Sequence, residues 1–100
     1  MYNVVVRPKA WELLEKHVRF AKNANKKYAN SLYDSFYKSL TLLATNPNQY
    51  PLWLPNFQLL LEYRRIIVKK RYSVIYYVQG NDVFVDYIFD ARMDNKKYFI

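Results

Sequence analysis

The stretch YRRIIVKKRYSVIYYV, residues 63–78, decides the fold class of this chain. It contains two runs of β-branched and aromatic residues, which are typical of strands, on either side of the tight junction Lys69-Lys70. A second junction, QGND, follows them, and its Gly80-Asn81 pair supplies the positive φ that a hairpin turn needs. The sequence therefore predicts an antiparallel three-stranded meander, with strands over residues 59–68, 71–78 and 82–90.

A different period governs the first half of the chain. The run YNVVVR, residues 2–7, is ended by Pro8 and predicts a first strand. From Ala10 onward the apolar residues recur at spacings of three and four, which indicates a helix. The string NANKK interrupts this pattern, and a second helical run follows over residues 27–45. Because the connection is short, we expect the two helices to form an antiparallel hairpin.

The order of these elements predicts an α+β fold. Prolines recur through residues 46–56, NPNQYPLWLPN, and forbid a regular element there, so we expect a loop held down by its aromatic and leucine side chains. The strands should form one curved sheet covered on one face by the helix hairpin, in a single domain over residues 1–100. In the last strand Asp82, Asp86 and Asp90 fall on one alternating set, which predicts that this face is at least partly exposed.

The charge of the chain favours an anionic partner. Lysine and arginine number 16 against 8 aspartates and glutamates, which gives a net charge of +8 at pH 7. A small domain this basic attracts polyanions, either nucleic acid or an acidic protein. The alternative is that the positive charge serves only to keep the protein in solution and binds no particular partner.

The remaining composition restricts the chemistry. The chain has no cysteine, so it forms no disulfides, and one histidine with scattered acids gives no metal-ligand spacing; we expect neither a metal nor another cofactor. Its first residues, MYNVVVRPKAW, lack a long apolar run, and no window reaches about 18 apolar residues. We therefore expect a soluble cytoplasmic protein that does not enter a membrane. His17, Trp11 and Trp53 are expected to be structural.

The element order, the length and two segments resemble a known family. YRRIIVKKRYSVIYYV and the later VFVDYIFDARMDNKKY, residues 83–98, are similar to the last strands and C-terminal segment of the RelE/ParE superfamily, the toxins of bacterial type II toxin–antitoxin systems. The resemblance covers essentially all 100 residues. It implies one of two activities: RelE-type members cleave mRNA on the ribosome, whereas ParE-type members poison DNA gyrase and do not cut RNA. Either kind is held inactive by a cognate antitoxin.

RNA cleavage of this kind uses the 2′-hydroxyl of the RNA as nucleophile. The enzyme must move protons, which typically contributes about 10²–10⁴-fold, and must hold cations against the phosphate. RelE-like members do this with arginine, lysine and a C-terminal tyrosine. Two of their positions are lost here, because a strand lysine falls on Ile66 and an arginine falls on Ser73. A third changes from lysine to Arg64, whose guanidinium is a poor proton donor.

The resemblance still implies a site. We expect Arg71, two residues before the lost arginine, to help Arg64 and Arg92 clamp the scissile phosphate, with Lys69 assisting. Tyr98, which lies six residues after Arg92 as in RelE-type members, would handle a proton. Each residue also has a plain structural role open to it: an ion pair with Asp90 or Asp94 for Arg92, packing or antitoxin contact for Tyr98, and solvation of a turn for Lys69 and Arg71.

Function therefore has three readings at this point. The first, which the sequence favours slightly over the second, is ribosome-associated mRNA cleavage, with the ribosome and mRNA as partners. The second is a gyrase-binding toxin that grips the enzyme with its helix hairpin and tail, although Asp90 stands where ParE-like members place a histidine. The third is a catalytically eroded binding module. For a toxin, we expect the antitoxin to be an acidic, partly disordered segment that folds onto the basic surface.

Overall fold

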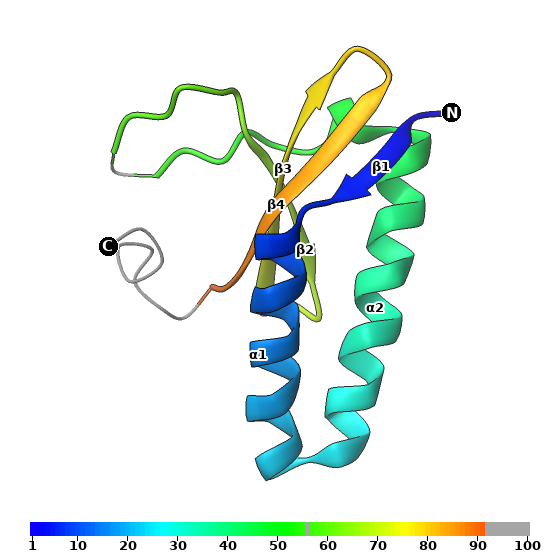
Figure 1. Ribbon diagram of the computed structural model, residues 1–100, viewed down its shortest axis with the longest axis vertical. Coiled ribbons are helices and arrows are strands. Elements are labelled where there is room, and N and C mark those ends of the chain that lie inside the picture. The colour runs from blue at the N-terminus through cyan, green and yellow to red at the C-terminus, as the bar shows by residue number, and fades with distance from the viewer. Residues whose placement is uncertain (56, 92–100) are drawn as a thin grey trace.

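The computed structural model describes residues 1–55 and 57–91, so Arg92 and Tyr98 lie outside the described residues. The predicted α+β fold is confirmed: a four-stranded sheet in the order β1-β4-β3-β2 packs against a helix hairpin (Figure 1). In chain order the elements are β1 (Asn3–Val6), α1 (Pro8–Ala24), α2 (Lys26–Thr45), the short 3₁₀ helix η1 (Pro47–Gln49), β2 (Arg64–Val68), β3 (Tyr72–Gln79) and β4 (Asp82–Asp90).

The helix hairpin turns on a single residue. Asn25 ends α1, where its N–H donates to the carbonyl oxygen of Ala21 at 2.8 Å. The same residue caps α2, because its side-chain oxygen accepts a hydrogen bond from the N–H of Tyr28 at 3.0 Å. Pro8 occupies the first turn of α1, where its missing N–H is not needed. The predicted antiparallel hairpin is therefore confirmed, with α2 beginning one residue earlier than expected.

The sheet is mixed. β1 lies parallel to β4, β3 lies antiparallel to β4, and β2 pairs antiparallel with β3 and forms one edge. The predicted strand over residues 59–68 is wrong in its first part, since β2 begins only at Arg64. The edge of the sheet there is taken by the preceding loop instead: Trp53 N–H donates to Tyr63 O at 2.9 Å and Arg65 N–H to Pro51 O at 3.0 Å.

A β-bulge changes the alternation of β4. Ile75 of β3 lies opposite Tyr87, whereas its neighbour Tyr76 lies opposite Val85, so Asp86 is an extra residue. Beyond it, Ile88 and Asp90 turn to the helix side, where they are 0% and 6% exposed. The prediction that Asp82, Asp86 and Asp90 share one exposed face is therefore wrong for Asp90, because the inserted residue reverses the faces.

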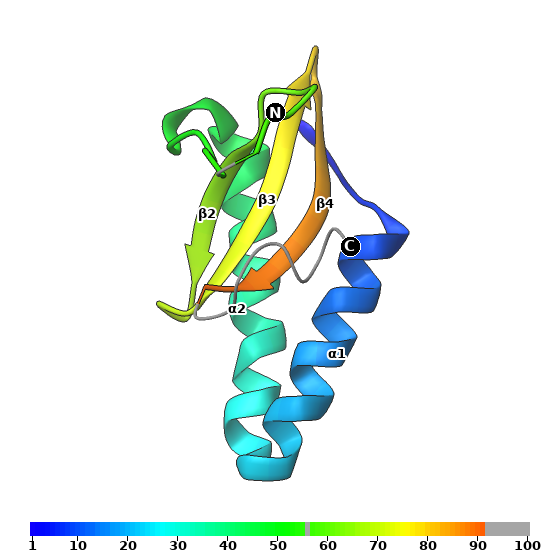
Figure 2. The same ribbon diagram turned by 90° about the vertical axis from the view of Figure 1, so that its left-hand side faces the viewer.

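The two faces of the sheet are covered differently. The helices bury one face, whereas the loop over residues 51–63 lies across part of the other (Figures 1 and 2). Trp53, predicted to be structural, is 5% exposed and its ring lies 5.7 Å from that of Phe89. The expected open face is thus partly closed by aromatic packing. Within the described residues, none of the helices is long and apolar enough to cross a membrane.

Candidate functional site

The turn between β2 and β3 carries Lys69, one of the predicted phosphate ligands, on a left-handed backbone. Lys69 and Lys70 both have positive φ, 57° and 54°, and Arg71 N–H donates to Val68 O at 3.2 Å across the turn. A turn with two left-handed residues favours Asn-Gly, and each L-residue with a β-carbon costs roughly 1–2 kcal/mol in this conformation. Lys69 extends its ammonium to 4.9 Å from the ring centroid of Tyr28, a cation–π contact with α2.

Arg71 is held by a buried acid. Its Nε and Nη2 donate to the same carboxylate oxygen of Asp90 at 3.1 and 2.9 Å. Its guanidinium also lies 5.1 Å from the ring centroid of Tyr72. The hydrogen bonds to Asp90 raise the pKa of Arg71. A role in phosphate binding stays a prediction for this residue.

His17 packs beside that ion pair and behaves as a structural residue. Its Nε2 lies 2.8 Å from the carbonyl oxygen of Ile88, and its ring lies 5.1 Å from that of Tyr72. Burial lowers the pKa of His17, an effect only partly opposed by the Ile88 carbonyl and the nearby Asp90 charge. A neutral imidazole that donates to Ile88 from Nε2 fits this site.

Arg64 lies at the opposite end of the β2–β3 hairpin. Its Nη1 donates to Tyr50 O at 2.7 Å, and its Nη2 lies 3.5 Å from a carboxylate oxygen of Glu62. The five residues from Arg64 to Val68 span about 13 Å at the rise of a β-strand, and Arg71 comes after them. The structure therefore brings Lys69 and Arg71 to one end of the hairpin and Arg64 to the other.

The bulge builds a polar cluster that the sequence did not reveal. Asp86 accepts a hydrogen bond from the Tyr63 hydroxyl at 2.6 Å, and its other oxygen lies 3.3 Å from Nε of Arg7. Arg7 also donates to the Tyr77 hydroxyl at 2.5 Å and lies 4.7 Å from the ring centroid of Phe84. Burial and the hydrogen bond to Asp86 raise the pKa of Tyr63, so its phenol is a hydrogen-bond donor and not an acid.

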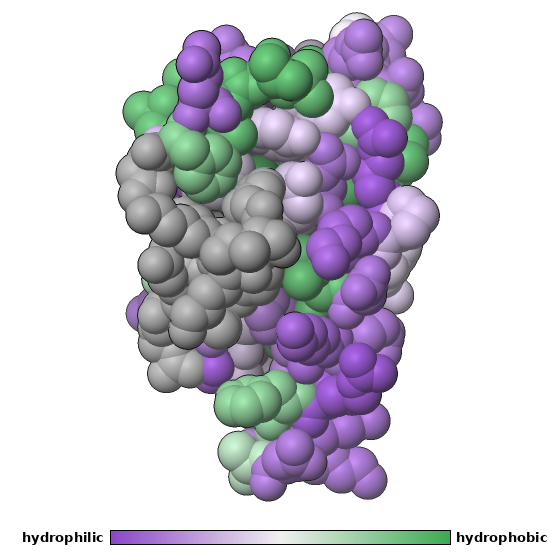
Figure 3. All heavy atoms as spheres, turned by 60° about the vertical axis from the view of Figure 1, so that its left-hand side comes forward, coloured by the Kyte–Doolittle hydropathy of each residue, from purple (hydrophilic) through white to green (hydrophobic). Residues whose placement is uncertain are grey.

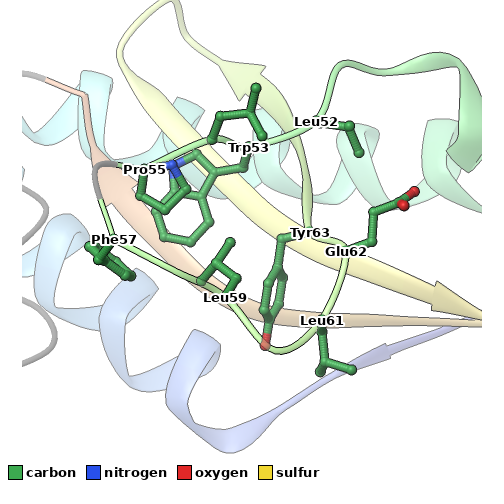
Figure 4. A pocket seen from close by; sticks show the side chains of 9 residues that line it. Leu52, Trp53, Pro55, Phe57, Leu59, Leu61, Glu62 and Tyr63 are labelled. Carbon is green, nitrogen blue, oxygen red and sulfur yellow. The ribbon is translucent and has the colours of Figure 1, made fainter.

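An apolar hollow of about 240 Å³ lies under the loop over residues 51–63. Trp53, Phe57, Leu59 and Tyr63 surround it (Figure 4). The exposed leucines of the same loop, Leu54 and Leu60 foremost, make this end of the molecule hydrophobic, whereas the surface over the helices is mainly hydrophilic (Figure 3). In the part of the chain that the structure describes, no group of histidine and acidic side chains is placed to hold a metal ion.

Comparison with known proteins defines the class of this fold. The family model described as the ParE toxin of the type II toxin–antitoxin system parDE matches residues 4–95. The chain belongs to this family, which confirms the predicted RelE/ParE relationship. A chain in the solved structure "Chromosomal ParDE TA system from P. aeruginosa" has the same fold, with a TM-score of 0.72 and 14% identity over 90% of this chain and 96% of that one. No curated protein matches the sequence.

Proposed function

We propose that this ParE-family toxin acts on DNA gyrase and does not cleave mRNA. Membership of the ParE family supports this choice, because the resemblance to ParE-type members implies gyrase poisoning. The proposal reverses the order of the two activities that the sequence alone favoured. It needs no nucleophile or general base from the chain, since the toxin would act by binding.

The separation of Arg64 from Arg71 is the observation that carries the proposal. An mRNA-cleaving site needs preorganised cations on one phosphate and a group that moves a proton. Arg64 donates to Tyr50 O and Arg71 to Asp90, at opposite ends of the hairpin, so neither is aimed with the other at a common point. Guanidinium groups also do not exchange protons near neutral pH. The three described residues of the expected cleavage set thus support binding over catalysis.

The test is a pair of parallel assays with the purified chain. Under the proposal, the toxin inhibits ATP-dependent supercoiling by gyrase and traps covalent gyrase–DNA complexes, while mRNA in a translation reaction stays intact. The substitutions Arg92→Ala and Tyr98→Phe should leave toxicity in cells unchanged. Cut mRNA with unaffected gyrase, together with loss of toxicity in both variants, would restore the nuclease assignment.

The partner that neutralises the toxin is proposed to be an acidic antitoxin segment. The net charge of +8 attracts it, and the hollow beside Trp53 and Tyr63 offers apolar contact once it arrives. Association should therefore slow markedly as salt increases, while dissociation changes little. Stopped-flow measurement at several salt concentrations tests this, and an association rate independent of salt contradicts it.

A further inference from the structure

Two pairs of lysines lie at the contact between the β2–β3 turn and α2 or next to that contact in the sequence. Lys69 and Lys70 form the turn, and Lys26 and Lys27 directly precede Tyr28, whose ring lies 4.9 Å from the Lys69 ammonium. We call these four residues the basic tip. Among the described residues, no carboxylate lies within ion-pair distance of any of them, in contrast to Arg7, Lys9, Arg64 and Arg71.

The positive charge of the basic tip is therefore not compensated within the described fold. The nearest buried acid, Asp90, already binds Arg71 through two hydrogen bonds. Lys26, Lys27 and Lys70 are exposed, so their ammonium groups are open to a ligand. The like charges of Lys69 and Lys70, adjacent in the turn, repel each other, and an anion bound between them would remove that repulsion.

The backbone of the turn adds an independent indication. Lys69 and Lys70 occupy left-handed conformations in which Asn-Gly would be more stable. Strained backbone of this kind concentrates at functional sites, because function requires a particular side chain there even though that residue lowers the stability of the fold. Here the strained positions carry two ammonium groups, which is the feature that a phosphate ligand requires.

A hollow of about 320 Å³ beside the tip is lined by Phe20, Tyr28 and Arg71. Phe20 is 72% exposed, although it is aromatic. Cations next to exposed aromatic rings suit a nucleic acid, because the cations contact its phosphates and the rings stack on its bases. A folding peptide instead needs several apolar anchors, and the exposed leucines that would supply them lie in the loop over residues 51–63.

We infer that the basic tip binds the phosphate backbone of a nucleic acid without regard to sequence, with Lys69 and Lys70 each neutralising one phosphate. This binding goes beyond the proposed action on gyrase, because it requires only the toxin and the nucleic acid. It is measured without gyrase, so its failure and that of the proposed function are separate results.

The experiment compares the full chain with the double variant Lys69→Asn/Lys70→Gly. Binding to a fluorescent DNA duplex of about two helical turns, and to RNA of the same length, is measured by anisotropy over a range of salt concentrations. Loss of two phosphate contacts should reduce the slope of log K against log salt by about 1.8, or about 60-fold in affinity at 0.1 M salt. The variant should fold well, because Asn-Gly relieves the strain, and its thermal unfolding is recorded in parallel.

Two matched variants separate the site from general charge. Lys69→Arg/Lys70→Arg retains both charges and should bind like the parent chain. Lys9→Gln/Lys38→Gln removes the same charge from two positions outside the basic tip, one in the first turn of α1 and one in the second half of α2, and should keep most of the affinity.

The outcomes are distinct. The inference is supported if Lys69→Asn/Lys70→Gly loses affinity while the other two variants keep it. Whether the parent chain then binds DNA or RNA more tightly identifies the nucleic acid that supplies the phosphate. An unchanged slope for Lys69→Asn/Lys70→Gly overturns the inference, and so does an equal loss in the Lys9→Gln/Lys38→Gln control. Tighter, tip-dependent binding of a polyglutamate peptide than of either nucleic acid would assign the surface to an acidic protein and also overturn it.

Discussion

Replacing Lys70 with glycine should stabilise the protein, although most substitutions destabilise. Lys70 has a φ of 54°, a conformation that costs an L-residue roughly 1–2 kcal/mol and that glycine adopts freely. Glycine also increases the entropy of the unfolded chain, which offsets about 0.4–1 kcal/mol of this gain. The expected net rise in the free energy of unfolding is about 0.5–1 kcal/mol, or about 2–8 °C in Tm for a domain of this size.

Urea denaturation followed by far-ultraviolet circular dichroism measures this change. The midpoint should move to higher urea with an unchanged m-value, because the surface exposed on unfolding stays the same. Lys70→Ala is the matched control: it removes the same charge but keeps the β-carbon that the left-handed conformation disfavours. Its free energy of unfolding should lie about 1 kcal/mol below that of the glycine variant.

Two results would refute this reasoning. If alanine stabilises as much as glycine, the gain comes from removing repulsion among the lysines and not from the backbone. If glycine destabilises, the side chain of Lys70 makes a contact that outweighs the strain.

Three further predictions concern residues near the helix hairpin. Asp90→Asn leaves the Arg71 guanidinium without its carboxylate and should lower the free energy of unfolding by about 3 kcal/mol, seen as an earlier urea midpoint; a change within error would mean that the pair is dispensable. Because burial lowers the pKa of His17 in the folded state, its contribution is complete above about pH 6.5 and is lost as the pH falls, with a slope of at most about 1.4 kcal/mol per pH unit. His17→Gln should flatten that slope in denaturation curves between about pH 7 and 5, and an unaltered slope contradicts the assignment. Asn25→Ala removes the acceptor for Tyr28 N–H and should cost about 1 kcal/mol in thermal unfolding, whereas Asn25→Ser should retain most of the stability, so equal losses would argue against the cap.

Local periodicity was enough to predict most of the fold. The spacing of apolar residues predicts the helices α1 and α2 from a few neighbouring residues. Runs of β-branched residues predict the strands β3 and β4 in the same way. Residues 59–63 misled because leucines are compatible with a strand, and only the presence of a pairing partner decides. Of residues 59–63, Tyr63 accepts a hydrogen bond from Trp53 N–H, and the pairing of this loop with the chain continues only at Arg64 and Arg65.

The candidate site was harder to predict, for two physical reasons. Alternation along a strand shows which side chains share a face, but it does not show which oxygen atoms from other segments reach them, as Tyr50 reaches Arg64. The bulge at Asp86 has no sequence signal of its own, so the cluster with Arg7 and the burial of Asp90 were both missed. The Lys69-Lys70 junction was identified, but its left-handed backbone was not, because lysine is a rare choice there.

The additional residue at Asp86 also affects how relatives are matched to this chain. In a relative whose last strand is regular, the side chain level with Ile88 comes one position sooner. Equating the two sequences without a gap at Asp86 would set inward side chains against outward ones for the rest of the strand. For such a relative, the same offset would carry on along the sequence to the positions matched with Arg92 and Tyr98.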